Sequence, residues 1–593
     1  MSDQKYCVGI DLGTTNTVVA FFSKEDESPR IEVLPIRQVI EPGVVEERNN
    51  LPSFAYQPLE TERAQADFDL PWHRGKWVSG TFARDRGAEV PTRFIASAKS
   101  WLCQSGVDRK ESFLPFKSDD DLELLSPFQL TVQYLKHIAG AWDAKMGTPL
   151  GDQDVVLTVP ASFDEEARQL TEEAAREAGL SDMTILEEPQ AALYAWLAQE
   201  GEAWREEVDK GDVILVCDVG GGTSDFSLIK VEENGGQLEL ERTAVGEHIL
   251  LGGDNMDLAL AYRAKAKMEE KKKLTAWQLR SLWFKARKVK EDLLGGQQER
   301  ATFTVLGTGL KSLIGGTIKA EFEADEALSF LVDGFFPQTE LDDLPAANGS
   351  HGVQEMGLPY ASDAAITKHL AKFLIKQSET EGFKWPNRIL FNGGVFNCEG
   401  LRQRVLQVVD AWGSRVQASP LEALNYQSLD DAVAKGAAYY AWSKTGKGIR
   451  IRAGIPRSVY IEVASSMPAI PGMPSPKKAL CIAPFGMEEG SEIKLEGETF
   501  ALRTGAPASF SFLSSTVRQE DEAGTDLEDW SEDELDGKNS MEVTLEKVDG
   551  LDGAVPVQLG AKVTEVGSLE LFFFHEPSGQ KWKLEYQVRD ENS

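Results

Sequence analysis

Cysteine is scarce in this 593-residue sequence, and its placement excludes a disulfide scaffold. The five cysteines are odd in number, far apart and without a Cys-x-x-Cys pair, which also argues against a zinc site. They are Cys7, Cys103, Cys217, Cys398 and Cys481. No run of about 18 apolar residues is present, so no transmembrane helix is expected. The N-terminus lacks a signal-peptide pattern. We therefore expect a cytoplasmic protein in a reducing compartment.

Basic residues are also under-represented. Lys and Arg number 62 against 96 Asp and Glu, which gives a net charge of −34. Such a field repels DNA, RNA and anionic membranes, so neither a nucleic acid nor a membrane is an expected partner. An anionic ligand would have to be held by local devices, namely backbone N–H groups, a few cations and Mg²⁺.

Several common catalytic signatures are missing. No Gly-x-x-x-x-Gly-Lys-Ser/Thr sequence occurs, and no Gly-x-Gly-x-x-Gly joins a strand to a helix, so P-loop and dinucleotide-binding folds are unsupported. The six histidines have no partner at ligand spacing. Neither Gly-x-Ser-x-Gly nor a Cys/His nucleophile arrangement is present.

What the sequence does contain is a duplicated hairpin turn. The strand-like run Tyr6–Ile10 enters Asp11-Leu12-Gly13-Thr14-Thr15-Asn16, and a second such run follows. Far downstream, Val213–Cys217 enters Asp218-Val219-Gly220-Gly221-Gly222-Thr223-Ser224-Asp225 and another strand. The repeat predicts two similar α/β lobes that face each other.

The rest of the first 442 residues alternates strands and helices. Asp154–Val159 is predicted as a buried strand and Ala167–Ala178 as a helix, while Tyr262–Leu294 is predicted as one long charged helical region. A small-residue helix, Ala432–Trp442, is predicted to close this domain.

Past residue 442 the predicted secondary structure changes from alternating strands and helices to mainly strands. Residues 443–456 are predicted as a linker, and 457–593 as a mainly β domain. Within it, an acidic segment at about 519–538 is predicted as a solvated, disordered surface loop.

The two turns suggest a specific chemistry. Each can wrap backbone N–H groups and hydroxyls around an anion, and two such nests across a cleft can hold nucleotide phosphates from both sides. The leading aspartates, Asp11 and Asp218, would order Mg²⁺ and its waters. The alternative is that both are merely structural hairpins.

With other segments, the turns resemble the heat shock protein 70 (DnaK-like) branch of the actin/sugar-kinase/chaperone superfamily. The matching segments are Leu51–Phe54, Ala98–Leu102, Val159–Phe163, Leu186–Ala192, Asn392–Gly394 and Asp430–Ala438. The resemblance runs in family order from residue 6 to about 442 and implies a two-lobed actin-like ATPase domain followed by a mainly β domain.

The resemblance also implies roles for single residues, with ATP and Mg²⁺ as ligands. Three residues would be catalytic: Lys99 would reach the γ-phosphate and the attacking water, and Glu188 and Asp225 would orient or polarise that water. Phosphate contacts would come from Gly13, Thr14, Thr15, Asn16, Gly220, Gly221, Gly222 and Thr223. The nucleoside would lie on Gly393, Gly394 and Val395, with Arg287, Lys288 and Asp430 beside it. Phe284 stands where the family has a ribose-binding glutamate, and either stacks on the ligand or packs within its helix.

In the family, a β-sandwich grips extended peptides under a helical lid. This chain departs from that pattern, because Lys447–Gly454 replaces the acidic linker and the sequence ends after a strand pair without room for a lid. The leading expectation is a lidless, ATP-hydrolysing chaperone-like protein that binds an unfolded client, with co-chaperones as further partners. The alternatives are an ATP-dependent module that binds one dedicated partner with little hydrolysis and, third, a small-molecule kinase.

Overall fold

The computed structural model describes residues 5–587 apart from internal gaps, of which the longest are 307–316, 347–357, 446–454 and 465–476. The chain forms two compact units. The first comprises Met1–Leu238 and Ala244–Arg450, and the second comprises Glu239–Thr243 and Ile451–Ser593. The predicted linker, 443–456, lies largely outside the described residues, so the predicted domain limits stay a proposal.

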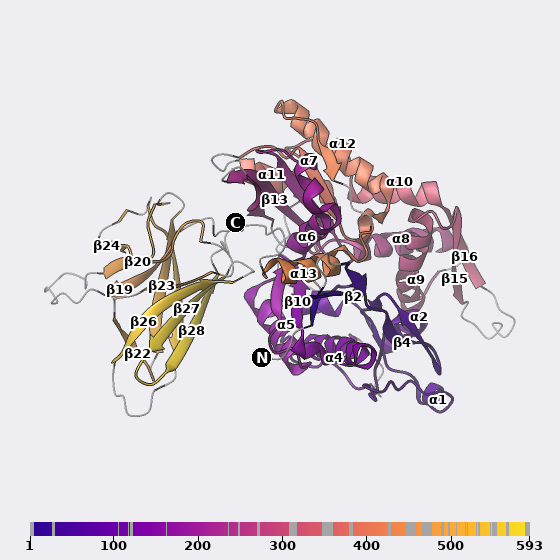
Figure 1. The fold of residues 1–593 in the computed structure, drawn as a ribbon. Coiled ribbons are helices and arrows are strands. Elements are labelled where there is room, and N and C mark those ends of the chain that lie inside the picture. Colours follow the sequence, from indigo (N-terminus) through magenta and orange to yellow (C-terminus); the bar gives the residue numbers. More distant parts are fainter. Residues whose placement is uncertain are drawn as a thin grey trace. The chain divides into compact units, whose positions relative to one another are not determined.

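The first lobe of unit 1 is built on a six-stranded sheet with β11-β10-β1-β2-β3 as its main path, and β6 pairs with β2 (Figure 1). Its strands are β1 (Tyr6–Leu12), β2 (Asn16–Ser23), β3 (Glu32–Val33), β6 (Leu51–Pro52), β10 (Asp154–Val159) and β11 (Thr184–Glu187). β1 and β2 form the predicted antiparallel hairpin, whereas β10 runs parallel to β1. Asp11 therefore lies at the end of a central, buried strand.

The second lobe repeats this plan. Its five-stranded sheet has the order β14-β13-β12-β17-β18. The strands are β12 (Val213–Val219), β13 (Ser224–Asn234), β14 (Gln237–Val245), β17 (Arg388–Asn392) and β18 (Glu422–Leu424). β12 and β13 form the second hairpin, and β17 runs parallel to β12. The predicted fold class, a two-lobed actin-like domain with duplicated hairpin loops followed by a β domain, is confirmed.

Two helices cross closely between the sheets: α6 (Glu188–Glu200) and α13 (Ala432–Ser443). A Cβ added at Gly436 would lie 1.7 Å from the carbonyl oxygen of Ala191, and one at Gly9 would lie 2.1 Å from that of Ala434. Only glycine permits these approaches, because any side chain would overlap backbone atoms. The β1–β2 hairpin therefore packs directly on the backbone of α13, and α13 packs directly on the backbone of α6.

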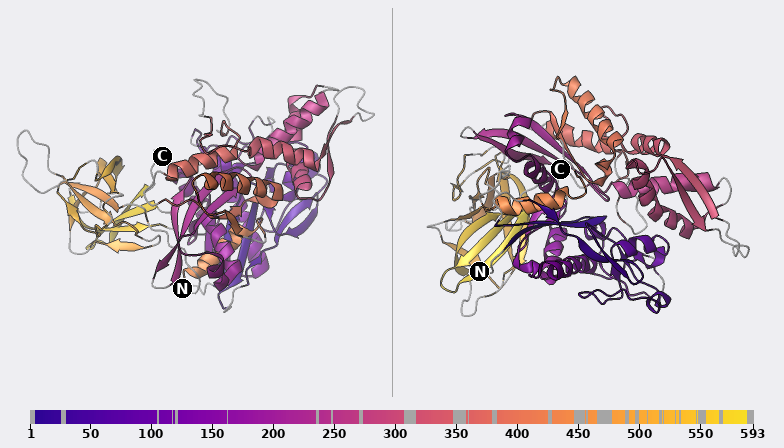
Figure 2. Two further views of the ribbon diagram at one scale, coloured as in Figure 1. Left: turned by 90° about the horizontal axis from the view of Figure 1, so that it is seen from above. Right: turned by 45° about the vertical axis from the view of Figure 1, so that its right-hand side comes forward.

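Smaller subdomains flank the two lobes, as Figure 2 shows for unit 1. On the first lobe these are β4 (Ile36–Glu41), β5 (Val44–Arg48), β7 (Ala55–Tyr56), β8 (Val78–Ser79), β9 (Phe94–Ile95), α1 (Glu60–Arg63), α2 (Thr81–Gly87) and α3 (Ala98–Leu102). On the second they are α8 (Gly253–Glu269), α9 (Ala276–Leu294), β15 (Arg300–Leu306), β16 (Thr317–Glu323) and α10 (Ala324–Phe335). The remaining helices of unit 1 are α4 (Pro127–Met146), α5 (Glu165–Glu177), α7 (Trp204–Glu207), α11 (Ile366–Ser378) and α12 (Glu399–Arg415).

The helical region predicted over Tyr262–Leu294 consists of two separate helices, the second half of α8 and the whole of α9. Thr275 caps α9 by accepting a hydrogen bond from the backbone N–H of Gln278 at 3.2 Å, and the Gln278 side chain returns a capping contact. This capping box fixes a new helix start inside a continuous charged pattern.

Unit 2 is a β domain of two principal sheets. One has the order β24-β20-β19-β23-β25, and the other β21-β26-β27-β28 with β22 also pairing β26. The strands are β19 (Ser458–Ala464), β20 (Lys477–Ala483), β21 (Glu492–Lys494), β22 (Phe500–Arg503), β23 (Pro507–Ser515), β24 (Asp526–Leu527), β25 (Asp536–Thr544), β26 (Ala554–Val563), β27 (Ser568–His575) and β28 (Gln580–Gln587). Apolar side chains of both sheets share one buried core.

The acidic segment departs from its prediction as a disordered loop, because its described residues pack on unit 2. Leu535 is buried with Tyr460, and Leu527 and Trp530 pack against the same cluster. Leu527 also belongs to β24, which pairs with β20. Apolar residues spaced through the acidic run anchor it, and the Asp521 carboxylate accepts a hydrogen bond from the Tyr460 hydroxyl.

Within the described parts of the chain, no helix is both long and apolar enough to cross a membrane. The five cysteines are all free, as their spacing predicted. Cytoplasmic location stays a prediction.

Candidate nucleotide-binding cleft

The two hairpin loops meet across a cleft inside unit 1. A Cβ added at Gly221 would lie 2.1 Å from the Thr15 hydroxyl oxygen, and one at Gly222 would lie 3.2 Å from the Thr14 methyl carbon. The glycines therefore let two threonine-bearing turns approach with their backbones exposed to one another. This is the geometry that an anion held by backbone N–H groups requires.

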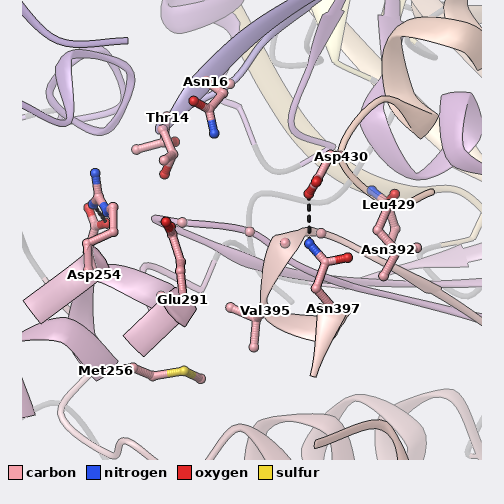
Figure 3. Close-up of a pocket in the computed structure, with 18 of the residues that line it drawn as sticks. Thr14, Asn16, Asp254, Met256, Glu291, Asn392, Val395, Asn397, Leu429 and Asp430 are labelled. Atoms are coloured by element: carbon pink, nitrogen blue, oxygen red, sulfur yellow. Dashed lines mark hydrogen bonds and ion pairs between the residues drawn. The ribbon is translucent and has the colours of Figure 1, made fainter. Parts of the chain in front are cut away.

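The cleft between the loops has a volume of about 560 Å³ (Figure 3). Most of the residues predicted for the site line it, although they come from seven separate stretches of sequence. These are Asp11, Gly13, Thr14, Thr15, Asn16, Lys99, Glu188, Asp218, Gly220, Gly221, Thr223, Arg287, Gly393, Gly394, Val395 and Asp430.

Three predicted residues do not line the cleft. Gly222 lies in the second loop beside Ser100. Asp225 is buried on β13, directly opposite Asp218 in the hairpin register. The expectation that Lys288 borders the nucleoside needs correction, because its side chain is 79% exposed and faces Asp292 at 3.6 Å.

Lys99 and Glu188 form a buried ion pair at the floor of the cleft. Lys99 comes from α3 and Glu188 from the first turn of α6. Burial lowers the pKa of Lys99, but the Glu188 and Asp11 carboxylates raise it further, so the ammonium stays charged. Burial and the Glu188 carboxylate raise the pKa of Asp11 to about 7. One cation thus stands among several acidic groups.

Asp218 is the counterpart of Asp11 in the second lobe. The Asn392 side-chain amide donates a hydrogen bond to it at 2.7 Å. Burial, together with the Glu188 and Asp225 carboxylates, raises the pKa of Asp218 well above its ordinary value. The buried side-chain oxygen of Asn392, Oδ1, has no hydrogen-bond partner in the described structure. The floor therefore carries unbalanced negative charge and an unused acceptor.

This charge balance fits a divalent cation. Two buried carboxylates whose pKa values are raised by burial and by the nearby Glu188 carboxylate would be stabilised by added positive charge. No group of three His, Cys, Asp or Glu side chains among the described residues is arranged to enclose a metal. An ion here would depend on water and phosphate oxygens, which is the coordination that Mg²⁺ favours.

Another part of the cleft wall is formed by the turn after β17 and by apolar side chains such as Val395, Leu429 and Val433. Gly393 has φ 86°, and an added Cβ would lie 2.2 Å from the Val219 carbonyl oxygen. This permits the chain to turn directly after β17 and to offer backbone at the cleft wall. Nearby, the Asn397 amide donates to Asp430 at 2.7 Å (Figure 3).

Several cleft residues carried no recognisable motif. Asp254, Lys290 and Glu291 line the cleft, and Glu291 projects into it in Figure 3. Arg287 pairs with Asp254 and, at 3.2 Å, with Asp257, while Lys290 pairs with Asp257 at 2.7 Å. The helical repeat could have identified the residues on α9. Positions 287, 290, 291 and 294 share one face of this helix, whereas 288 does not.

Phe284 lies outside this cleft. Its ring contacts Phe94 edge-on at 4.7 Å and stacks on Trp283 at 5.6 Å. Of the two interpretations of this residue, helix packing agrees with the structure.

The paired lobes and facing loops define an actin-like ATPase domain. The family model for Hsp70 protein matches residues 94–323. The similar curated proteins include a chaperone protein HscA homolog of Shewanella loihica, 31% identical over 54% of this chain and 46% of that protein. A chaperone protein HscA of an Enterobacter species is 32% identical over 44% and 37%, respectively.

The chain is thus similar to the Hsp70 family over part of its length. A further relative, a chaperone protein HscA homolog of Pseudomonas putida, is 33% identical over 44% of this chain and 37% of its own length. The chain thus spans less than half the length of the curated relatives it matches.

Proposed function

We propose that the cleft binds ATP with Mg²⁺ and hydrolyses it. The observation that carries this proposal is the meeting of two glycine-threonine loops above the Lys99–Glu188 pair. The loops would hold the phosphates, and the wall from Gly393 to Val395 would hold the nucleoside. Asp11 and Asp218 would hold the hydrated Mg²⁺, which supplies charge neutralisation for the phosphates when bound.

Hydrolysis requires water oxygen to bond to the γ-phosphorus while the bond from that phosphorus to the ADP oxygen breaks. The proton of the water passes to a phosphate oxygen. Lys99 would stabilise the charge on the transferred group, and Glu188 would orient the water by accepting its hydrogen bond. Asp225 lies opposite Asp218 in the hairpin register and would be a positioning residue.

We further propose that nucleotide state controls the binding of an extended, unfolded polypeptide by unit 2. The support is the partial similarity to the Hsp70 family, the chaperone names of the relatives and the β architecture of this unit. Exposed strand edges can pair with an extended chain through backbone hydrogen bonds. The proposal includes an unfolded protein as the client and co-chaperones as further partners.

The test is single-turnover ATP hydrolysis and equilibrium ATP binding by the full chain, with and without a reduced, carboxymethylated unfolded protein. We expect Mg²⁺-dependent binding, slow hydrolysis and stimulation by the unfolded protein. Asp225→Asn should slow hydrolysis about 10-fold or more while ATP still binds. Asp342→Asn, at an exposed position, is the control. Tight ATP binding without turnover or stimulation would instead favour a dedicated-partner binding module.

A further inference from the structure

A second cavity, of about 370 Å³, opens beside the nucleotide cleft within unit 1. Six aromatic side chains line it: Phe94, Trp101, Phe116, Trp283, Phe284 and Tyr360. We call this cavity the outer pocket. It shares only Asp254 and Arg287 with the nucleotide cleft, and the proposed ATP chemistry leaves the rest of its wall unused.

The aromatic wall is held in place by its own packing. Trp101 stacks on Phe116 with ring centroids 5.8 Å apart and an interplanar angle of 16°. On the opposite side, Trp283 stacks on Phe284 at 6°, and Phe94 supports the Phe284 ring edge-on. Two stacked aromatic pairs on one cavity suit a flat ring system, because aromatic faces and edges both offer favourable contacts to another ring.

The charges on the wall are not fully balanced. Arg287 and Lys290 neutralise Asp254 and Asp257 through their shared ion pairs. Arg280 also lines the outer pocket, and no carboxylate of the described residues forms an ion pair with it. One guanidinium is therefore the surplus charge of an otherwise aromatic cavity, which favours an anionic ligand group.

We propose that the outer pocket binds a small planar aromatic carboxylate, with the rings among the aromatic side chains and the carboxylate on Arg280. A guanidinium matches a carboxylate through two parallel hydrogen bonds. A phosphate of higher charge is disfavoured, because the pocket provides one surplus cation and has two aspartates nearby. The cavity volume lies in the range of small-molecule sites, roughly 300–1,000 Å³.

The test is titration calorimetry of the full, nucleotide-free chain with 2-naphthoate and with its uncharged analogue 2-naphthalenemethanol. We expect saturable one-site binding of 2-naphthoate. Arg280→Gln should weaken 2-naphthoate about ten-fold and change the affinity for the alcohol less than two-fold, because only the anion uses the guanidinium. Ala96→Trp, which adds an indole to the pocket wall, should abolish binding of both.

The matched control is Arg263→Gln, which removes an exposed arginine of α8 outside the pocket and should change neither affinity. Thermal unfolding of each variant reports whether it folds. If Ala96→Trp does not fold, the titration of Arg280→Gln alone tests the proposal. The proposal is overturned by lack of saturable binding, by equal effects of the two arginine substitutions, or by unaltered binding in folded Ala96→Trp. Failure of ATP binding elsewhere does not bear on this result.

Discussion

Lys99 and Glu188 form a buried ion pair across the floor of the cleft, although 89 positions separate them in the chain. The pair joins α3 to the start of α6 beside the first phosphate loop. It places the Lys99 ammonium among the Glu188 and Asp11 carboxylates, and this arrangement is the basis for the charge-altering variants below.

Lys99→Ala should lower the single-turnover ATP hydrolysis rate by about 100-fold while equilibrium ATP binding changes much less. The reason is that Lys99 would stabilise charge that develops during transfer, whereas the loops hold the ground-state phosphates. Rapid-quench assays and equilibrium dialysis measure the two effects separately. Lys110→Ala, which removes an exposed lysine paired with Glu173, is the control and should leave both unchanged. Equal loss of binding and hydrolysis would contradict the assigned role.

Metal-free protein should lose stability through its Asp11 carboxyl as pH rises from about 4 to about 7. The folded-state pKa of Asp11 is about 7, against an ordinary value of 3.8, so the folded chain keeps a proton that the unfolded chain releases. Mg²⁺ should therefore raise the Tm more at pH 8 than at pH 6. Scanning calorimetry at both values, with Mg²⁺ or EDTA, measures this difference.

Asp11→Asn should reduce the pH dependence of the Mg²⁺ effect, because the amide does not titrate and only Asp218 remains to contribute. Asp342→Asn, at an exposed position, should retain the wild-type response. An Mg²⁺ effect that is the same at both pH values in wild type would exclude the proposed link between Asp11 and the ion.

Gly436→Ala should destabilise unit 1 by about 3 kcal/mol or more, because the new methyl group would overlap the Ala191 backbone where α13 crosses α6. Gly334→Ala is a matched control in α10, where an added Cβ meets nothing within 4 Å. Its effect should stay within about 1 kcal/mol, with the sign favouring alanine. Urea denaturation followed by circular dichroism compares them, and similar midpoints for both variants would contradict the close helix contact.

Tyr460→Phe should loosen the acidic segment of unit 2. The Tyr460 hydroxyl donates to the Asp521 carboxylate at 2.6 Å, and Asp521 also binds Arg518 at 2.7 Å. Loss of the first bond should cost about 1 kcal/mol, because the carboxylate keeps its arginine partner. Cleavage by a glutamate-specific protease near residues 520–528 should become faster. Tyr262→Phe, at an exposed tyrosine, should match wild type, and unchanged cleavage in Tyr460→Phe would contradict the anchoring role.

The duplicated loops could be predicted from sequence because each phosphate nest is contiguous and rich in glycine and threonine. Positions such as Asp254 and Glu291 could not, because they reach the cleft through the phase and packing of α8 and α9 rather than through a local pattern. Lys288 shows the same limit, since one step along α9 turns a side chain by about 100° and takes it out to solvent. The packing of the acidic segment could not be predicted either. Its acidic composition is typical of a disordered loop, and the few apolar residues that anchor it, such as Trp530, do not change that composition.

Two contacts join the subdomain of α2 and α3 to that of α8 and α9. The Ser97 hydroxyl donates to Asp254 at 2.8 Å, and the Arg287 guanidinium lies over the Phe54 ring at 5.0 Å. A nucleotide bound as proposed would be retained by these contacts until they open. Its residence time would then depend on a hinge motion as well as on phosphate affinity. A protein that pulled α9 away from the first lobe would act as a release factor without touching the nucleotide.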